Sequence, residues 1–178
     1  MRRLPLCLNR NHATPHECTE ALIAAEGNRM PMTVWDPCCG NGDISVVLTG
    51  TGRQVTSGHG RANYPPSSIA SASGLSILRK STPPIPNLRW TMSVVTNPPF
   101  GLAEAILRHA AAIDIEYLVF LHKAHWLNAQ ARAVMVETVW CPARCWLLTW
   151  RPDFKGQGAP TMDCSWFVFE RSSCGNVL

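Results

Sequence analysis

The chain has 178 residues and a mass of 19.6 kDa, which suits one domain with a substantial core. Its composition, 46% hydrophobic and 16% charged, is typical of a folded globular protein and excludes a disordered one. The net charge of +4 permits a polyanionic partner without requiring one. Thirteen of the sixteen basic residues are arginine, the cation that best suits phosphate and base-edge contacts.

No apolar run approaches the roughly 20 residues that cross a bilayer, so we expect no membrane partner. The apolar residues 4–8 are too few for a signal peptide, which predicts a cytoplasmic protein. Eight cysteines without an export signal then indicate reduced thiols. Their spacing contains no CxxC pair and the histidines no HExxH pattern, so we expect no metal.

The first predicted element is a helix over residues 15–26. Thr14 is a cap residue, Pro15 fits the first helical position, and Glu17 lies three residues after the cap. Gly27 ends the helical pattern.

The next elements alternate between strand and helix. Residues 33–36 predict a strand, residues 38–42 a glycine turn, and residues 43–48 the opening of a second helix. Residues 54–57 predict a second strand. Serine, proline and glycine dominate residues 58–88, which we interpret as a long, irregular and partly mobile segment.

Regular elements resume after this segment. The predicted order is strand 93–96, helix 102–112, strand 117–122, helix 127–139, and two closing strands over 144–150 and 165–170. This alternation predicts an α/β fold, with a mostly parallel sheet and helices on both faces. Because no helix joins the closing strands, we expect an antiparallel C-terminal hairpin at one sheet edge. We find no repeat and expect a single domain over residues 1–178.

Two segments place unusual residues at the carboxyl ends of strands, where α/β sheets bind ligands. The first is Asp36-Pro-Cys-Cys-Gly-Asn-Gly-Asp43. Gly40 and Gly42 let the backbone pass close to a bound molecule, and the following helix N-terminus favours a polar or anionic group. For a GxG pattern alone, an ordinary strand-to-helix turn would be the better interpretation.

The second segment is Asn97-Pro98-Pro99-Phe100, after the strand at residues 93–96. Two prolines make a rigid, extended backbone whose carbonyls remain acceptors. Asn97 adds a side-chain carbonyl and Phe100 a flat ring. This set of groups suits an exocyclic amine on an aromatic base. The alternative is a strand terminator followed by a core phenylalanine.

The two segments together resemble the amino-methyltransferases that use S-adenosylmethionine, specifically the N6-adenine DNA type found in phages and prophages. Thr14-Pro15 matches the threonine-proline that precedes the first motif in that family. Residues 101–104 fit the helix after the second motif, and Arg151-Pro152 and residues 166–170 resemble its closing strands. The resemblance covers most of the chain and implies a Rossmann-like methyltransferase fold.

The resemblance also implies S-adenosylmethionine as cofactor and DNA, or RNA, as the partner that presents a flipped-out adenine. Asn97 and the carbonyl of Pro98 would accept the hydrogens of adenine N6, and Phe100 would stack on the base. The implied catalytic residues are Asn97, Pro98, Pro99 and Phe100. The implied cofactor-binding residues are Thr14, Pro15, Asp36, Pro37, Gly40 and Gly42.

One departure from the family concerns acidic residues. Family members carry an acid after the second strand to hold the cofactor ribose, but here residues 54–57 run into Gly58, and no Asp or Glu occurs between Asp43 and Glu104. A second acid, expected near the adenine, is also missing. The alternative function is therefore a non-catalytic relative that binds nucleic acid or a partner protein. The motif also leaves RNA adenine or a protein glutamine amide open as the target.

Target recognition depends on two predicted loops, over residues 123–130 and 151–158. They interleave basic and aromatic residues, a pattern that can grip a nucleic-acid strand. Ordinary solvated loops are the alternative. The residues concerned are Lys123, Trp126, Arg151, Phe154 and Lys155.

Overall fold

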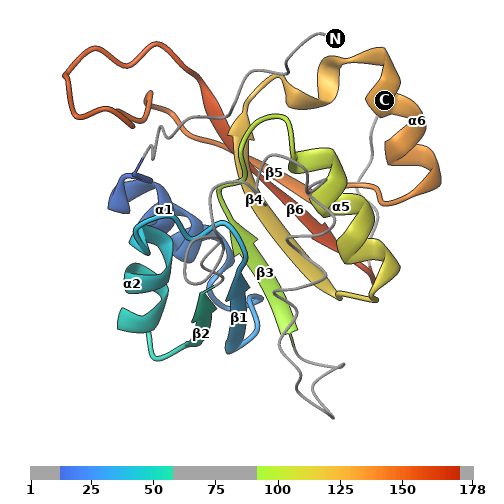
Figure 1. Cartoon of the computed structure of the whole chain (residues 1–178), viewed down its shortest axis with the longest axis horizontal. Helices are drawn as coiled ribbons and strands as arrows, with labels where there is room; N and C mark the ends of the chain where they lie inside the picture. Colours follow the sequence, from blue (N-terminus) through green and yellow to red (C-terminus); the bar gives the residue numbers. More distant parts are fainter. Residues whose placement is uncertain (1–12, 58–91, 173–178) are drawn as a thin grey trace, which may run out of the picture.

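The computed structural model describes residues 13–57 and 92–172, which form one six-stranded sheet with helices packed on it (Figure 1). The strands are β1 (Thr33–Asp36), β2 (Gln54–Ser57), β3 (Met92–Thr96), β4 (Tyr117–Lys123), β5 (Arg144–Leu147) and β6 (Cys164–Glu170). The helices are α1 (His16–Glu26), α2 (Asp43–Gly50), α5 (Ala103–Ala112), the short 3-10 helix η1 (Trp126–Asn128) and α6 (Gln130–Thr138). The irregular segment predicted over residues 58–88 lies outside the described residues.

The strand order is β2-β1-β3-β4-β6-β5. Strands β2, β1, β3 and β4 pair in parallel, and β6 runs antiparallel to both β4 and β5. The mixed α/β sheet is confirmed, and so is the antiparallel C-terminal hairpin, with β5 at the sheet edge. Because β5 runs in the same direction as β4, it ends at the same edge of the sheet as the parallel strands.

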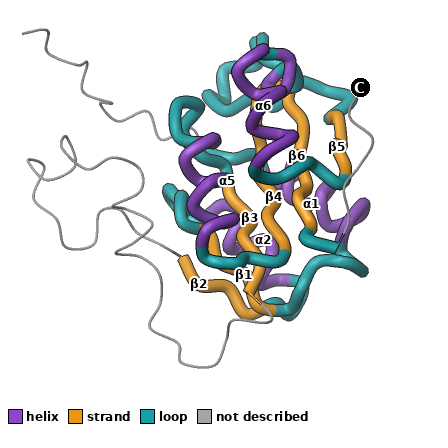
Figure 2. The backbone as a smooth tube through the Cα atoms, turned by 90° about the vertical axis from the view of Figure 1, so that its right-hand side faces the viewer, coloured by secondary structure: helices purple, strands orange, loops and turns teal. Residues whose placement is uncertain are grey.

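The sheet separates two hydrophobic clusters. Figure 2 shows α5 and α6 in front of the sheet and α1 and α2 behind it. Strand β4 supplies both clusters in alternation: Leu118 and Phe120 pack with α5 and α6, while Val119 and Leu121 pack with α1 and α2. Successive strand residues point to opposite faces. The continuously apolar β4 is therefore buried on both sides, as the prediction of helices on both faces requires.

Two helix starts differ from the sequence prediction. Helix α1 has Pro15 as its N-cap and no side-chain cap, so the prediction that Thr14 caps this helix is wrong. The helix predicted over residues 127–139 is also interrupted. Trp126 is buried in the core within η1, Ala129 is extended, and α6 begins only at Gln130.

The cysteines are free at five described positions: Cys18, Cys38, Cys39, Cys145 and Cys164. The prediction of reduced thiols is confirmed at these five positions, which do not include Cys141. No group of three or more potential ligand residues could hold a metal ion within residues 13–57 and 92–172. In the same ranges, no helix is both long and apolar enough to cross a bilayer.

Candidate functional site

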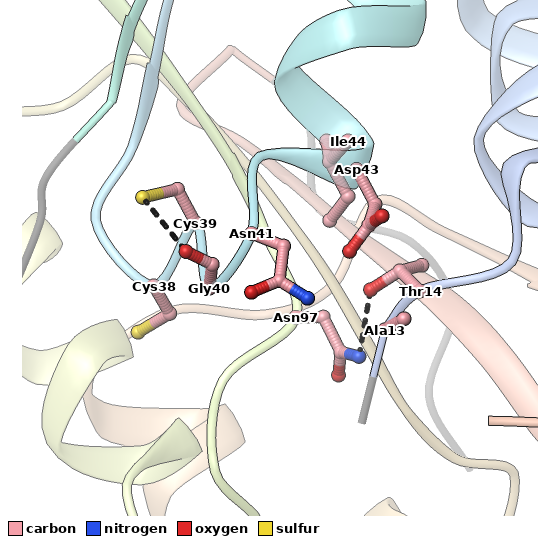
Figure 3. Close-up of a pocket in the computed structure, with 9 residues that line it drawn as sticks. All are labelled: Ala13, Thr14, Cys38, Cys39, Gly40, Asn41, Asp43, Ile44 and Asn97. Carbon is pink, nitrogen blue, oxygen red and sulfur yellow. Dashed lines mark hydrogen bonds between the residues drawn. The ribbon is translucent and has the colours of Figure 1, made fainter. Parts of the chain in front are cut away.

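The loops that follow β1 and β3 lie side by side at one edge of the sheet. The two strands pair in parallel, with Trp35 beside Val94, so their carboxyl ends reach this edge together. A small pocket opens between the loops and the segment before α1 (Figure 3). Its lining residues are Ala13, Thr14, Cys38, Cys39, Gly40, Asn41, Asp43, Ile44 and Asn97.

The glycine turn forms one wall of the pocket. Gly40 and Gly42 have positive φ angles of 53° and 90°, a conformation that other residues adopt at a cost. A Cβ atom on either residue would meet nothing within 4 Å, so the backbone conformation, not crowding, requires glycine. Gly42 is also the N-cap of α2, and Asp43 begins that helix beside the pocket.

Asp36 lies behind this turn and does not line the pocket. Its side chain is fully buried, and Oδ1 accepts hydrogen bonds from the Thr96 hydroxyl at 2.8 Å and the Cys38 N–H at 3.3 Å. Oδ2 accepts from the Ser45 hydroxyl at 3.3 Å. Burial raises the pKa of Asp36 to about 6, although these hydrogen bonds partly oppose the shift. Asp36 therefore anchors the turn to β3 and α2.

Asn97 forms the opposite wall of the pocket. Its side-chain amide nitrogen donates a hydrogen bond to the Thr14 hydroxyl at 3.0 Å. The side-chain carbonyl oxygen points away from Thr14 and accepts no hydrogen bond from the described residues (Figure 3). The sequence analysis assigned Thr14 to the cofactor and Asn97 to the target amine, and the structure places the two side chains in contact although 83 positions separate them.

The rest of the second motif leads into α5. The carbonyl of Pro99 accepts the N–H of Leu102 at 2.8 Å, which turns the chain into the helix. The carbonyl of Pro98 has no hydrogen-bond partner among the described residues. Phe100 is 43% exposed, so the alternative of a core phenylalanine is wrong. Of this motif, only Asn97 lines the pocket, while the partly exposed Phe100 ring contacts His122 and Lys123.

No protein-family model matches the sequence, and no curated protein matches it. Solved structures do match. One, provisionally assigned as an RNA methyltransferase from Pyrococcus horikoshii, is 14% identical with a TM-score of 0.55, over 87% of this chain and 82% of its own. The modification subunit of a provisionally assigned type I restriction enzyme from Vibrio vulnificus YJ016 is 12% identical with a TM-score of 0.58, over 92% and 45%.

A third structure, provisionally assigned as a class I S-adenosylmethionine-dependent methyltransferase from Listeria monocytogenes, is 13% identical with a TM-score of 0.52. It matches over 97% of this chain and 64% of its own. The chain has the class I methyltransferase fold. At these identities the likeness carries the fold of the methyltransferases and not their substrates. The chain also spans less than half of the modification subunit.

The turn between β1 and α2 supplies both space and a charged group to the pocket. Beside Gly40 there is open space, and the Asp43 carboxylate lines the same pocket, where it suits a cationic group such as an ammonium. Asn41, Asp43 and Ile44 were missed as pocket residues at the sequence level, although they directly adjoin the predicted glycine turn. Pro15, Pro37 and Gly42 lie close in sequence to lining residues but do not themselves line the pocket.

The end of β2 presents a hydroxyl group to its neighbours. Strand β2 ends at Ser57, whose hydroxyl donates to that of Ser45 at 2.8 Å. Among the described residues, no carboxylate stands at the end of β2 to accept ribose hydroxyls. Gly58, where the family pattern expects an acid, lies outside the described residues.

The two loops with basic and aromatic residues differ from their prediction. Trp126 is 1% exposed and belongs to the core, and Phe154 is half-buried against the cluster of α1 and α2. The Trp126 ring is not available for stacking, so the prediction is wrong for this residue, while Phe154 keeps part of its ring exposed. Arg151 is exposed but pairs with Asp163 at 2.8 Å. Phe100 is thus the better candidate for stacking on a base.

Proposed function

We propose that the chain transfers the methyl group of S-adenosylmethionine to the N6 amino group of adenine in DNA. The observation that carries the proposal is the Asn97–Thr14 hydrogen bond at 3.0 Å. It uses the amide nitrogen of Asn97 and leaves the side-chain carbonyl to face a substrate. An acceptor held in this way suits a primary amine, which has hydrogens to donate.

Three groups of the second motif can act on one planar amine. The Asn97 carbonyl and the Pro98 carbonyl can each accept one hydrogen of the amine, and the exposed Phe100 ring can stack on the base that carries it. As the amine nitrogen attacks, positive charge develops on it, and the two acceptors stabilise that charge. Acceptors fixed in advance by Thr14 and by the proline backbone need little reorganisation.

The reaction needs no covalent enzyme intermediate. When bound, S-adenosylmethionine supplies an electrophilic methyl group on a sulfonium centre. The lone pair of the amine forms the new nitrogen–carbon bond as the carbon–sulfur bond breaks, and the nitrogen then loses a proton to solvent. The described residues contribute by holding the amine in line with the methyl group, and proximity and fixed dipoles supply most of the rate.

We propose DNA as the partner because it carries the target adenine and because the chain has a net positive charge that favours a polyanion. The net charge is +4, and the structural neighbours include a provisionally assigned RNA methyltransferase and the modification subunit of a provisionally assigned type I restriction enzyme. Lys123 lies next to the site, with Nζ 4.9 Å from the Phe100 ring centroid. RNA adenine and a glutamine amide present a similar NH2 group, so the test compares all three.

The test is incorporation of labelled methyl groups into unmethylated bulk DNA, total RNA and protein. We expect label in DNA adenine, and we expect Asn97→Ala to lower the rate about 10²–10³-fold because it removes one fixed contact to the transition state. The matched control is Asn28→Ala, at an exposed position after α1. Unchanged turnover in a folded Asn97→Ala protein would remove the amine-binding role from this motif. Label confined to RNA or protein would replace DNA as the substrate.

A second candidate function, a non-catalytic relative of the methyltransferases, is favoured by Ser57 at the end of β2. A lost hydrogen bond to a charged group typically costs ~1.5–3 kcal/mol, which is more than tenfold in affinity. Calorimetric titration with S-adenosylmethionine separates the candidates. Heat of binding at micromolar to millimolar cofactor supports the enzyme, whereas its absence at millimolar concentration supports the non-catalytic relative.

A further inference from the structure

We propose that His122 is a positioning residue that holds Phe100, and with it the backbone of the second motif, in the orientation needed to receive the target base. This inference rests on the proposed function, because it assigns Phe100 to base stacking. His122 is the next-to-last residue of β4 and belongs to neither motif of the family resemblance. No feature of the sequence alone relates it to Phe100, which lies 22 positions earlier.

Two contacts link the imidazole to Phe100. Nε2 of His122 lies 3.3 Å from the carbonyl oxygen of Phe100, within hydrogen-bond distance. The two rings meet edge to face, with centroids 4.9 Å apart and an interplanar angle of 64°. One side chain therefore restrains both the backbone and the ring of Phe100. Lys123, whose Nζ lies 4.9 Å from the ring centroid, adds a further contact to this exposed ring.

The imidazole is itself held rigidly. His122 is 4% exposed, and its ring lies 6.3 Å from Phe120 and 5.6 Å from Trp126, measured between centroids. Trp126 is fully buried, which explains why the helix predicted to begin near it is interrupted: the tryptophan of η1 packs into the core beside His122. The support for Phe100 thus comes from the strand and the core, not from a loop.

The protonation state agrees with a donor role for Nε2. Nδ1 of His122 is buried with no hydrogen-bond partner among the described residues, so the neutral ring that carries its proton on Nε2 satisfies the geometry best. Burial is the main cause that lowers the pKa of His122 to about 4. The hydrogen bond to the Phe100 carbonyl partly opposes this shift, while the charges of Arg132, Lys123 and His125 act in the same direction as burial. At neutral pH the ring is uncharged and donates to the carbonyl of Phe100.

A positioning role follows because Phe100 belongs to the same segment as the proposed acceptors for the amine. Asn97, Pro98 and Phe100 lie within one segment of four residues that contains two prolines. A displacement of the Phe100 carbonyl therefore also displaces the acceptors for the amine. A misplacement of about 1 Å can cost on the order of 10²-fold in rate. His122 acts through Phe100 and has no need to touch the substrate.

The first test reads the contact directly and needs no substrate. Phe100–Gly101 is the one Phe-Gly pair in the sequence, so labelling with [1-13C]Phe and [15N]Gly gives a single carbonyl signal for Phe100. We expect His122→Phe, which retains a ring but no donor, to move this signal upfield. His122→Gln retains a donor and should leave the signal closer to the wild-type position. The same signal in His122→Phe and wild type would overturn the proposal.

The second test measures turnover. We expect His122→Phe to lower kcat/KM for bulk DNA about 10–100-fold while the dissociation constant for S-adenosylmethionine stays unchanged. His122→Gln should recover part of this loss, which a general packing defect would not allow. The matched control is His109→Phe, at a buried histidine in the last turn of α5, which should leave the Phe100 carbonyl signal in place. Equal kcat/KM in His122→Phe and wild type would overturn the positioning role.

The two tests separate the failure of this inference from the failure of the proposed function. If wild-type protein does not methylate bulk DNA, the proposed function fails, but the carbonyl signal still decides whether His122 positions Phe100. If wild type methylates DNA and the signal does not respond to His122→Phe, the proposed function stands and the inference about His122 is wrong.

Discussion

Asp36 shows how one buried carboxylate can organise a site without facing the ligand. Its oxygens accept hydrogen bonds from Thr96 on β3, Ser45 on α2 and the N–H of Cys38 in the turn. The glycine turn, α2 and the strand that leads to Asn97 thereby converge on a single side chain. The sequence predicts a polar residue at the end of β1. It does not predict whether the side chain of that residue points into the pocket or lies behind the turn.

Ionisation of Asp36 should cost stability. Its folded pKa of about 6 lies above the usual value, so the folded protein binds this proton more tightly than the unfolded chain between about pH 4 and 6. Wild type should lose stability as pH rises through this window, by up to about 3 kcal/mol. Asp36→Asn cannot ionise, so we expect its stability relative to wild type to improve from pH 4 to pH 7. Urea unfolding at four pH values checks this, and parallel pH profiles would contradict it.

His122 should have the opposite dependence. Its folded pKa of about 4 lies below the unfolded value, so the unfolded chain binds a proton that the folded protein does not. Its contribution is complete above about pH 6.5 and is lost as pH falls towards 4, by up to about 3 kcal/mol. His122→Phe should therefore gain stability relative to wild type as pH falls. The same unfolding series tests this, and a gain in the other direction would show that His122 is protonated in the folded state.

At the scale of elements, sequence patterns predicted most strands and helices closely. Strand β1 occupies the predicted residues 33–36, since a short apolar segment between Pro31 and Pro37 has little freedom in its bounds. The start of α6 could not be predicted in the same way. Trp126 is apolar and fits a helical pattern, but its burial beside Phe120 is a tertiary contact that ends the turn before the helix begins.

The last residue of α1 joins that helix to the far edge of the sheet. Glu26 is fully buried, and its carboxylate accepts hydrogen bonds from Tyr117 at 2.8 Å, Arg144 at 2.6 Å and Trp146 at 2.7 Å. Burial alone would raise the pKa of Glu26, but these donors hold it below its usual value. Arg144 also pairs with Glu170 at 2.9 Å. The network links α1 to β4, β5 and β6.

Removing the cation from this network should be costly. Arg144→Met leaves the Glu26 carboxylate buried without its charged partner, and breaking such a pair typically costs about 3–5 kcal/mol. The matched control is Arg108→Met, which removes an exposed pair with Glu104 and should cost less than about 0.5 kcal/mol. Chemical denaturation of both variants at pH 7 provides the comparison. Equal losses would mean that Glu26 takes a proton or a water when Arg144 is absent.

At the scale of the whole molecule, the candidate site assembles from three distant segments. Thr14, Gly40 and Asn97 line one pocket because parallel strands deliver their carboxyl ends to one edge. This much could be predicted, since each residue stands beside a recognisable motif. The support from His122 could not, because its relation to Phe100 depends on the register of β3 and β4 and on how the chain turns after each strand.

The same sheet also unites the two hydrophobic clusters, which predicts cooperative unfolding. Leu107 of α5 and Leu48 of α2 are both fully buried, in clusters on opposite faces. Because alternate residues of β4 belong to the two clusters, neither face can unfold without disrupting the other. The two clusters should therefore behave as one thermodynamic unit.

We expect Leu107→Ala and Leu48→Ala each to lower the free energy of unfolding by about 2–5 kcal/mol within a single transition. Far-UV circular dichroism and tryptophan fluorescence should give coincident curves for both variants, since backbone and core are lost together. Leu147→Ala, at a position 62% exposed on β5, is the control and should have little effect. If Leu48→Ala instead gave two separated transitions, with the tryptophan signal lost after part of the helical signal, the α1–α2 face would be an independent unit. The sheet would then not couple its two sides.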